Sequence, residues 1–571
     1  MRPLDIGVLV ATLAGLVGYG LWRSRGTRDL PAYLVAGRQL PWPVIALSVM
    51  ATQASAVTFL ATPGQGYVGG LSFVQFYFGL PLAMVVLCLT AVPIYQRLLV
   101  STAYEFLEQR FDGRTRTLAA GLFLLQRGLA AGVTLFAPAL VLSVILGWPL
   151  AATVTLLGVL VVGVTALGGS RAIGPTHALQ FSIIMVTMGL AFVLALKALP
   201  PALGAGDAFA VAGHLGKLNA VDLHFDPRGR YNLWAGLVGG LFLQLSYFGT
   251  DQSQVGRYLA AKSAKASRMG LLFNGLFKVP MQFAILLLGV IVFVVYQFAP
   301  SPLFFDPSSV ARVRAGVHAG EWQVLEAEHA RLGEQRRALL TGWVTARHAG
   351  AAAAQPGADA LPALQARDKA VRDSAVALIK ATDARANTND TNYIFLHFVL
   401  SRLPAGLVGL VLAAILAAAM NSISSEIHAL TSTTVVDVIA RLPGAPKDDA
   451  AILGWSRAIG VFWTAFAVMF AQFAGRAGSL VETVNVMGSL FYGTILGIFL
   501  CAFWLRRAGG PAVFFAALVA EAAVLVCWKL DLVFWLWFNV VGCLVTVGIA
   551  ALFAQLVPKW RAPAREHATG A

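Results

Sequence analysis

The chain has 571 residues, of which 58% are hydrophobic and only 12% are charged, and its mean hydropathy is +0.74. Soluble domains carry about a quarter charged residues and cannot cover so much apolar surface, so composition excludes a soluble globular protein. A net charge of +15 could indicate a nucleic-acid partner. The Lys and Arg residues, however, lie mainly in short gaps between apolar segments, where they orient a membrane protein. We therefore expect a protein of the lipid bilayer with no nucleic-acid partner.

Thirteen segments of the chain are apolar enough to cross a bilayer, which takes about 20 residues of helix. In chain order they are approximately residues 6–22, 42–68, 73–96, 116–146, 151–168, 177–199, 233–256, 269–298, 394–424, 453–474, 481–504, 511–529 and 533–557. The first is flanked on its far side by Arg23, Arg25 and Arg28, which predicts an uncleaved span and not a signal peptide. The four cysteines lie inside such segments without metal-ligand spacing, and we interpret them as small core residues.

The basic gaps give the expected orientation. They all fall on one side of the thirteen spans and are residues 23–38, 97–116, 257–268, 441–447, 506–507 and the tail from Lys559. The positive-inside rule assigns that side to the cytoplasm. We therefore expect a multi-pass protein of the cell inner membrane, with its N-terminus outside and its C-terminus in the cytoplasm.

One long segment, residues 300–392, is charged and rich in alanine. Its pattern predicts a helix over Val310–His348, a linker over Ala349–Ala360 and a further helix to about Ala384. Span parity puts this insert outside the cell, and long loops do not obey the charge rule. Two interpretations are open: a solvated helical hairpin that caps the outer mouth, or a surface for gating or partner binding.

Two spans contain clusters of small and hydroxylated residues. The second span holds Ser48 to Thr58, followed by Pro63-Gly64-Gln65-Gly66, and the ninth holds Ala417 to Glu426. A membrane helix breaks only where its freed backbone groups line a cavity or meet protein, and transporters use such breaks to bind ions and solutes. Small residues also allow close helix packing, and hydroxyls form interhelical hydrogen bonds. Both interpretations are open from composition alone.

Several motifs in consistent order resemble the sodium:solute symporter family. The segment from Leu403 to Ser422, together with Thr431-Ser-Thr-Thr-Val-Val-Asp437 at its end, looks like the family's eighth core helix. Tyr33-Leu-Val-Ala-Gly-Arg38, Ala103–Phe111 and Phe248–Ser263 resemble other conserved stretches of the family. The resemblance implies an all-α membrane protein with a LeuT-type core of five plus five helices in inverted repeats, with extra N- and C-terminal helices.

The resemblance also implies a domain organisation. The parts are an N-terminal helix and loop (1–41), a first repeat (42–199), an extracytoplasmic loop (200–232), a second repeat (233–504) that is interrupted by the insert, and two final helices with a cytoplasmic tail (505–571).

A sodium site between the first and eighth core helices follows from the same resemblance. The matching positions are the backbone carbonyls of Ala51, Ala54 and Ala418 and the side chains of Asn421 and Ser422. The family usually has two hydroxyls here, and Asn421 replaces the first. An amide oxygen also ligates sodium, so the site is altered and not abolished.

The solute site that the resemblance implies lies at the centre of the core. Gln53, Phe76 and Gln244 match positions that face the central cavity, with Tyr247 at the inner gate and Lys278 close by. Glutamine offers both donors and acceptors, as a hydroxyl-rich solute needs. Each glutamine could equally join two helices.

Arg127 and His177 are polar residues within or at the end of spans. Arg127 lies about 18 Å along its helix, at 1.5 Å per residue, where an unpaired arginine is costly. It resembles loosely an arginine that sialate transporters of the family use, and it either binds a substrate carboxylate or pairs with a buried acid such as Asp251 or Glu482. His177 stands where many members have aspartate on the inner sodium path, and it is either part of the ion exit path or an ordinary histidine at a helix end.

These features predict a secondary active transporter and not an enzyme. We expect sodium-coupled symport of a small polar solute, a sugar or a carboxylate, by alternating access, with Na+ as the coupling ion. Two alternatives are open: a proton-coupled carrier on the same fold that uses His177, and a non-transporting sensor that reads solute through the insert.

Overall fold

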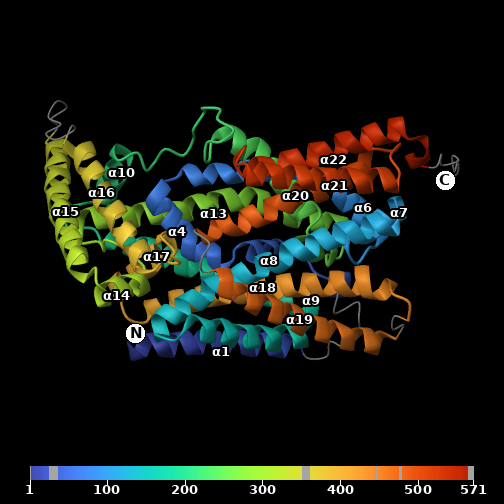
Figure 1. The fold of residues 1–571 in the computed structure, drawn as a ribbon. Helices are drawn as coiled ribbons and strands as arrows, with labels where there is room; N and C mark the ends of the chain where they lie inside the picture. Colours follow the sequence, from blue (N-terminus) through green and yellow to red (C-terminus); the bar gives the residue numbers. More distant parts are fainter. Residues whose placement is uncertain (1, 25–35, 350–359, 445–447, 475–478, 563–571) are drawn as a thin grey trace.

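A computed structural model describes residues 2–24, 36–349, 360–444, 448–474 and 479–562, and within them the regular elements are helices (Figure 1). The α-helices are α1 (Pro3–Ser24), α3 (Trp42–Gln53), α4 (Ala56–Gly69), α5 (Leu80–Leu89), α6 (Ala91–Leu98), α7 (Ala103–Arg110), α8 (Gly113–Leu146), α9 (Leu150–Lys197), α10 (Ala205–His214), α11 (Gly240–Gly249), α12 (Gln252–Leu259), α13 (Ala264–Phe298), α14 (Pro307–Ala315), α15 (Ala319–His348), α16 (Ala360–Thr382), α17 (Thr391–Arg402), α18 (Leu407–Thr433), α19 (Asp449–Ala474), α20 (Leu480–Trp504), α21 (Gly510–Lys529) and α22 (Leu536–Leu556). Short 3-10 or π turns include η2 (Ser72–Tyr77), η3 (Ala235–Gly239) and η4 (Thr434–Val438).

The helices long and apolar enough to cross a membrane number nine within the described residues, or ten when the bent pair α3 and α4 counts as one span. Three further apolar helices, Pro3–Tyr19, Leu150–Val161 and Ala235–Gly249, match predicted spans but are shorter than 18 residues. The all-α membrane fold is therefore confirmed, whereas the count of thirteen spans is not. Hydropathy locates apolar segments but does not fix how much of each is helix.

Two predicted boundaries are wrong. The segments 151–168 and 177–199 form one unbroken helix, α9, because a helix tolerates glycine at a cost of about 1 kcal/mol per residue. The predicted span 394–424 is divided into α17 and α18. The division lies at Pro404 and at Gly406, whose φ of 85° is a left-handed conformation that favours glycine.

The long helices run side by side in an elongated bundle (Figure 1). Helix α1 begins at the end of the molecule where α15 and α16 lie, and α22 ends at the opposite end. Large apolar side chains are exposed on the peripheral helices, among them Phe462 and Met469 on α19 and Leu518 and Val526 on α21. A surface of this kind suits contact with acyl chains and not with water.

The insert forms α14, α15 and α16, with its own small apolar core around the fully buried Trp322. The predicted helical patterns correspond to these helices, with a break at Gly316; residues 350–359 of the predicted linker lie outside the described residues. Asp207 on α10 accepts hydrogen bonds from Arg347 and His348 at the end of α15. Polar contacts join α15 to α16, from His329 and Arg336 to Asp368 and from Arg367 to Glu328.

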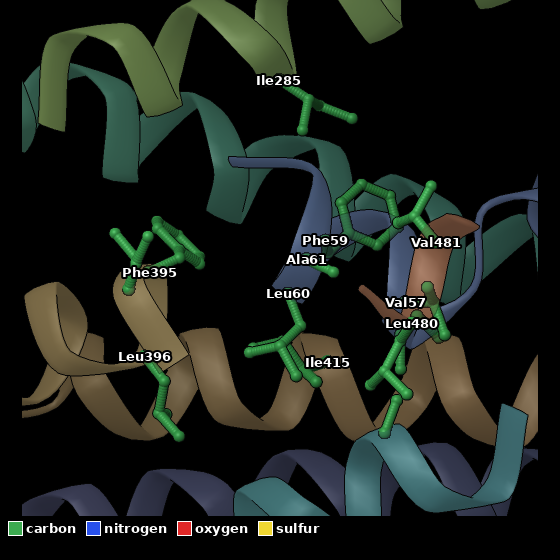
Figure 2. Close-up of a cluster of buried hydrophobic side chains, with 14 of the residues drawn as sticks. Val57, Phe59, Leu60, Ala61, Ile285, Phe395, Leu396, Ile415, Leu480 and Val481 are labelled. Carbon is green, nitrogen blue, oxygen red and sulfur yellow. The ribbon is translucent and has the colours of Figure 1, made fainter. Parts of the chain in front are cut away.

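The second predicted span breaks at one point. Helix α3 ends at Gln53, Ser55 is extended, and α4 begins at Ala56 with its axis turned by 61°. Figure 2 shows side chains of α4 packed among those of α13, α17 and α18, including Leu60 beside Ile415.

Of the two interpretations left open for this segment, close packing holds for Pro63–Gly66, because these residues are helical within α4. The glycines serve this packing. A Cβ on Gly64 would lie 2.1 Å from the Thr391 carbonyl oxygen, and one on Gly289 of α13 would lie 1.9 Å from that of Pro63. Backbone-to-backbone contact of this kind fixes α4 against α13 and α17.

Candidate functional site

The break between α3 and α4 lies against the middle of α18. Ser422 Oγ donates a hydrogen bond to the Thr52 carbonyl oxygen at 3.2 Å, and Ser425 Oγ lies 3.2 Å from Thr52 Oγ1. The last carbonyls of α3 have no partner in a following helical turn, because the chain turns away at Ala54. Carbonyl and hydroxyl oxygens from two helices therefore meet at one buried point.

The structure brings the five predicted sodium residues to this region. Ala51, Ala54 and Ala418 are completely buried, and Asn421 and Ser422 are each 1% exposed. Among the described residues, Asn421 Nδ2 has no hydrogen-bond partner. The donor set consists of uncharged oxygens, which fits a small hard cation such as Na+.

A polar cavity of about 100 Å³ adjoins the break. It is lined by Thr52, Gln53, Ser55, Val57, Thr58, Thr62, Phe76, Tyr77, Gln126, Arg127, Thr134, Leu243, Gln244, Tyr247, Glu426, Val481, Val484, Asn485 and Tyr492. The predicted solute residues Gln53, Phe76, Arg127, Gln244 and Tyr247 are therefore gathered around one space.

The sixth predicted solute residue, Lys278, is not part of the cavity wall. It is 1% exposed on α13, with its Nζ 5.6 Å from the centre of the Tyr77 ring. Gln282, one turn further along, donates to Tyr77 Oη at 2.8 Å. Lys278 lies behind Tyr77 because η2 places the aromatic ring between α13 and the cavity.

Arg127 is paired with two buried acids. Its guanidinium forms ion pairs with Asp251 at the start of α12 and with Glu426 on α18, the latter at 3.1 Å. It also donates to Tyr492 Oη at 2.5 Å, and Tyr492 donates to Asp251 at 2.8 Å. The sequence offered two acids as partners of Arg127, and Asp251 is the one that pairs with it. Glu482 is not, since it accepts from Tyr231 at 2.6 Å.

Glu426 and Tyr492 are site residues that sequence reasoning missed. Glu426 follows the small and polar cluster of the ninth span, which is a local signal of a buried carboxylate. Its pairing with Arg127 joins residues 299 positions apart and has no local sequence signal. Tyr492 stands in an ordinary apolar segment.

His177 is placed on α9 beside α3. It is 2% exposed and hydrogen-bonds to the backbone of Ser48, whose carbonyl also accepts from Thr52 Oγ1 at 2.8 Å. His177 thus lies about one helical turn from the candidate cation site, on the side of α3 away from the break.

A model of the sodium:solute symporter family matches residues 33–317 and 372–519, on both sides of the insert. The chain belongs to the sodium:solute symporter family. Residues 318–371, which contain α15 and part of α16, are not matched by the family.

Two curated members of this symporter family are similar over part of their length. The human sodium/iodide cotransporter is 32% identical over 316 residues, which cover 54% of this chain and 47% of the relative. The sodium-coupled monocarboxylate transporter 2 of Bos taurus is 33% identical over 242 residues, which cover 42% of this chain and 39% of the relative. The alignments therefore span less than half the length of either relative.

A solved structure of a Na+-coupled sialic acid symporter, in a substrate-bound outward-open state, superposes with a TM-score of 0.75. The superposition covers 97% of this chain and 98% of the other, at 20% sequence identity. This likeness confirms the fold class that the sequence predicts for the symporter.

Proposed function

We propose that this protein couples the downhill entry of sodium to the uptake of a small polar organic solute. The observation that carries the proposal is the break at Ala54–Ser55, where the Thr52 carbonyl of α3 accepts from Ser422 next to a cavity lined in part by polar side chains. Family membership and the sodium-coupled relatives support it. None of these features includes a nucleophile with its base, so we also propose that the protein is not an enzyme.

In this mechanism sodium enters from outside and binds between α3 and α18. The carbonyls of Ala51, Ala54 and Ala418 and the side chains of Asn421 and Ser422 would ligate it. Because the ligands come from two helices, binding holds those helices together and stabilises one state of the carrier.

Solute then binds in the cavity lined by Gln53, Phe76, Gln244 and Tyr247. The carrier closes on its extracytoplasmic side, and sodium and solute are then released into the cytoplasm. Arg127 shapes this cavity through its ion pairs. Sodium entry releases about 2.3 kcal/mol per charge for each 100 mV of membrane potential. Since about 1.4 kcal/mol corresponds to a tenfold ratio, one ion supports accumulation of tenfold or more.

We place the carrier in the inner membrane with its N-terminus outside and its C-terminus in the cytoplasm. The basic gaps support this orientation. The opposite ends at which α1 begins and α22 ends fit an odd number of crossings. The insert would then face the outside, and the exposed apolar side chains of α19 and α21 would contact lipid.

The direct test is uptake into proteoliposomes with an imposed sodium gradient. We expect accumulation with sodium outside and little with potassium, and loss of the sodium dependence in Ser422→Ala. The matched control is Ser401→Ala, since that exposed hydroxyl lies on α17, donates to the His397 carbonyl and is not one of the proposed sodium ligands. Unchanged sodium dependence in Ser422→Ala would overturn the proposed ion site.

Proton coupling is the rival that His177 raises, because this titratable group contacts the backbone of Ser48 near the proposed ion site. If protons drive uptake, His177→Asn abolishes accumulation under a pH gradient, and sodium has little effect. If sodium drives it, His177→Asn retains a sodium-dependent signal.

A further inference from the structure

The charges around the cavity do not cancel. Arg127 is 3% exposed and carries one positive charge, whereas Asp251 and Glu426, 1% and 6% exposed, carry two negative charges between them. Arg127 and Glu426 are the ionisable acidic and basic residues among those that line the cavity. Lys278 is not part of the cavity wall, and its Nζ lies 5.6 Å from the centre of the Tyr77 ring. The formal charges of Arg127, Asp251 and Glu426 therefore sum to −1.

One carboxylate oxygen of Glu426 accepts hydrogen bonds, and the other has no partner in the described part of the chain. Its Oε1 accepts from Arg127 Nη1 at 3.1 Å and from Thr134 Oγ1 at 3.4 Å. Within the described part of the chain, its Oε2 has no hydrogen-bond partner although it is buried. An unpaired buried acceptor costs about 1–3 kcal/mol, and more when it is charged, so this oxygen is a strong site for a donor from a ligand.

Most of the other fully buried wall atoms that lack a partner in the described part of the chain are also acceptors. Tyr492 uses its single proton on Asp251, so its oxygen accepts from Gln126 Nε2, at 3.4 Å, and leaves Gln126 Oε1 without a donor. Among the described residues, Gln53 Oε1 and Gln244 Oε1 likewise lack partners. Among the described wall atoms that are fully buried, one donor, Arg127 Nε, also lacks a partner.

Arg127 is poorly placed to bind a carboxylate from solute. Its Nη1 and Nη2 groups already contact Glu426, Asp251 and Tyr492. A solute carboxylate would enter a site of net negative charge next to Glu426 Oε2, and like charges at such distances repel strongly in a dry site.

We propose that the solute is a small organic cation, whose protonated amine donates to Glu426 Oε2 and to the surrounding glutamine oxygens. This inference rests on the proposed function, since it takes the cavity to be the solute site. The cavity of about 100 Å³ suits a small solute.

The test measures binding to the purified full-length protein in sodium buffer, by the shift in thermal unfolding midpoint as each probe is titrated. The probes are three matched sets with equal carbon chains: ethanolamine and 3-aminopropanol, ethylene glycol and 1,3-propanediol, and glycolate and 3-hydroxypropionate. We expect the amino alcohols to bind at least tenfold more tightly than the diols and the hydroxy acids. Tightest binding by the diols or the hydroxy acids, or no binding by the amino alcohols, overturns the proposal.

The matched variant is Glu426→Gln, with Glu521→Gln as control because Glu521 is a carboxylate on α21 that does not line the cavity. We expect Glu426→Gln to weaken amino alcohol binding at least tenfold and to leave diol binding unchanged, and Glu521→Gln to change neither. Equal loss for amino alcohols and diols in Glu426→Gln contradicts the charge argument. If Glu426→Gln does not fold, the ranking of the probes on the wild-type protein still decides.

Sodium-gradient uptake separates this inference from the proposed function. Binding of amino alcohols without sodium-driven accumulation contradicts symport and leaves the charge inference standing. Sodium-driven accumulation of a hydroxy acid in place of an amino alcohol supports symport and contradicts the charge inference.

Discussion

Arg127 Nη1 on α8 lies 3.1 Å from Glu426 Oε1 on α18, and both side chains are buried at the cavity wall. The same guanidinium pairs with Asp251, so three helices meet at one charge cluster. A cluster of this kind links the stability of the bundle to the electrostatics of the cavity.

Replacing Arg127 with Gln should destabilise the protein strongly. It leaves two buried carboxylates without their cation, which typically costs about 3–5 kcal/mol. The measurement is the thermal unfolding midpoint in detergent, with Arg268→Gln as control because that arginine is exposed on α13. Adding Asp251→Asn and Glu426→Gln to the Arg127 variant should recover part of the loss. A midpoint equal to that of the control would contradict the structural role of this cluster.

Asn421 permits a graded test of the candidate sodium site. Asn421→Ser restores the hydroxyl that the family usually has and should keep sodium dependence, whereas Asn421→Ala removes a ligand. Loss of about 1.4 kcal/mol of binding raises the half-saturating sodium concentration about tenfold. The readout is solute uptake as a function of sodium, and equal values for the two variants would place Asn421 outside the site.

Gly289 tests the packing of α4. A Cβ at this position would lie 1.9 Å from the Pro63 carbonyl oxygen, so Gly289→Ala must push α13 away from α4. Overpacking of this kind costs about 1–3 kcal/mol. Gly189 on α9 is the control, because a Cβ there would meet nothing within 4 Å. We expect a lowered thermal midpoint for Gly289→Ala alone, and equal midpoints would contradict the close approach.

Asp368 makes the packing of the insert depend on pH. Burial opposes its ionisation, but the hydrogen bond from His329 and the charges of His329 and Arg336 outweigh burial and hold the pKa of this carboxyl below its ordinary value. Because the pKa of Asp368 is lower in the folded state than in the unfolded state, its ionised form stabilises the folded hairpin. This stabilisation is complete at pH values above the unfolded-state pKa, about 3.9, and it is lost as the pH falls through the folded-state pKa. We expect α15 and α16 to separate in acid, below about pH 4.

At neutral pH, Asp368→Asn should mimic that loss and raise hydrogen exchange in α16. The control is Asp373→Asn, since Asp373 is exposed on the same helix. Equal exchange in the two variants would show that the contacts from His329 and Arg336 do not hold the hairpin.

Much of the fold was predictable because a membrane span is a local property of composition. Apolar segments and the insert were located correctly, since neither requires knowledge of distant contacts. The division at Pro404 and Gly406 was missed because the residues on both sides are apolar and hydropathy averages over them. The state of Pro63–Gly66 stayed open from the sequence because glycine favours both turns and close packing, and only the neighbouring backbones of Thr391 and Leu286 distinguish the two.

The candidate site was predictable in its residue types but not in its pairings. Resemblance to the family indicated Ala51, Asn421 and Ser422, which the structure brings to one region, and it gave no reason to join Glu426 to Arg127. Lys278 was expected close to the cavity, and it is not in the cavity wall because its Nζ lies by the Tyr77 ring, 5.6 Å from the ring centre. Side-chain partners that come from distant helices are decided by tertiary packing.

The hairpin of α15 and α16 is fastened at two separate places. Asp207 on α10 holds the end of α15, and Asp390, just before α17, accepts from Arg372 of α16. A space of about 500 Å³ lies beneath it, bordered by Tyr67 of α4 and Phe293 of α13. An antibody fragment that holds α15 against α16 would thus hold α10 and α17 at a fixed distance from each other. It would slow any transport cycle in which those two helices move apart. It would do so without contacting the candidate sodium site or the solute cavity.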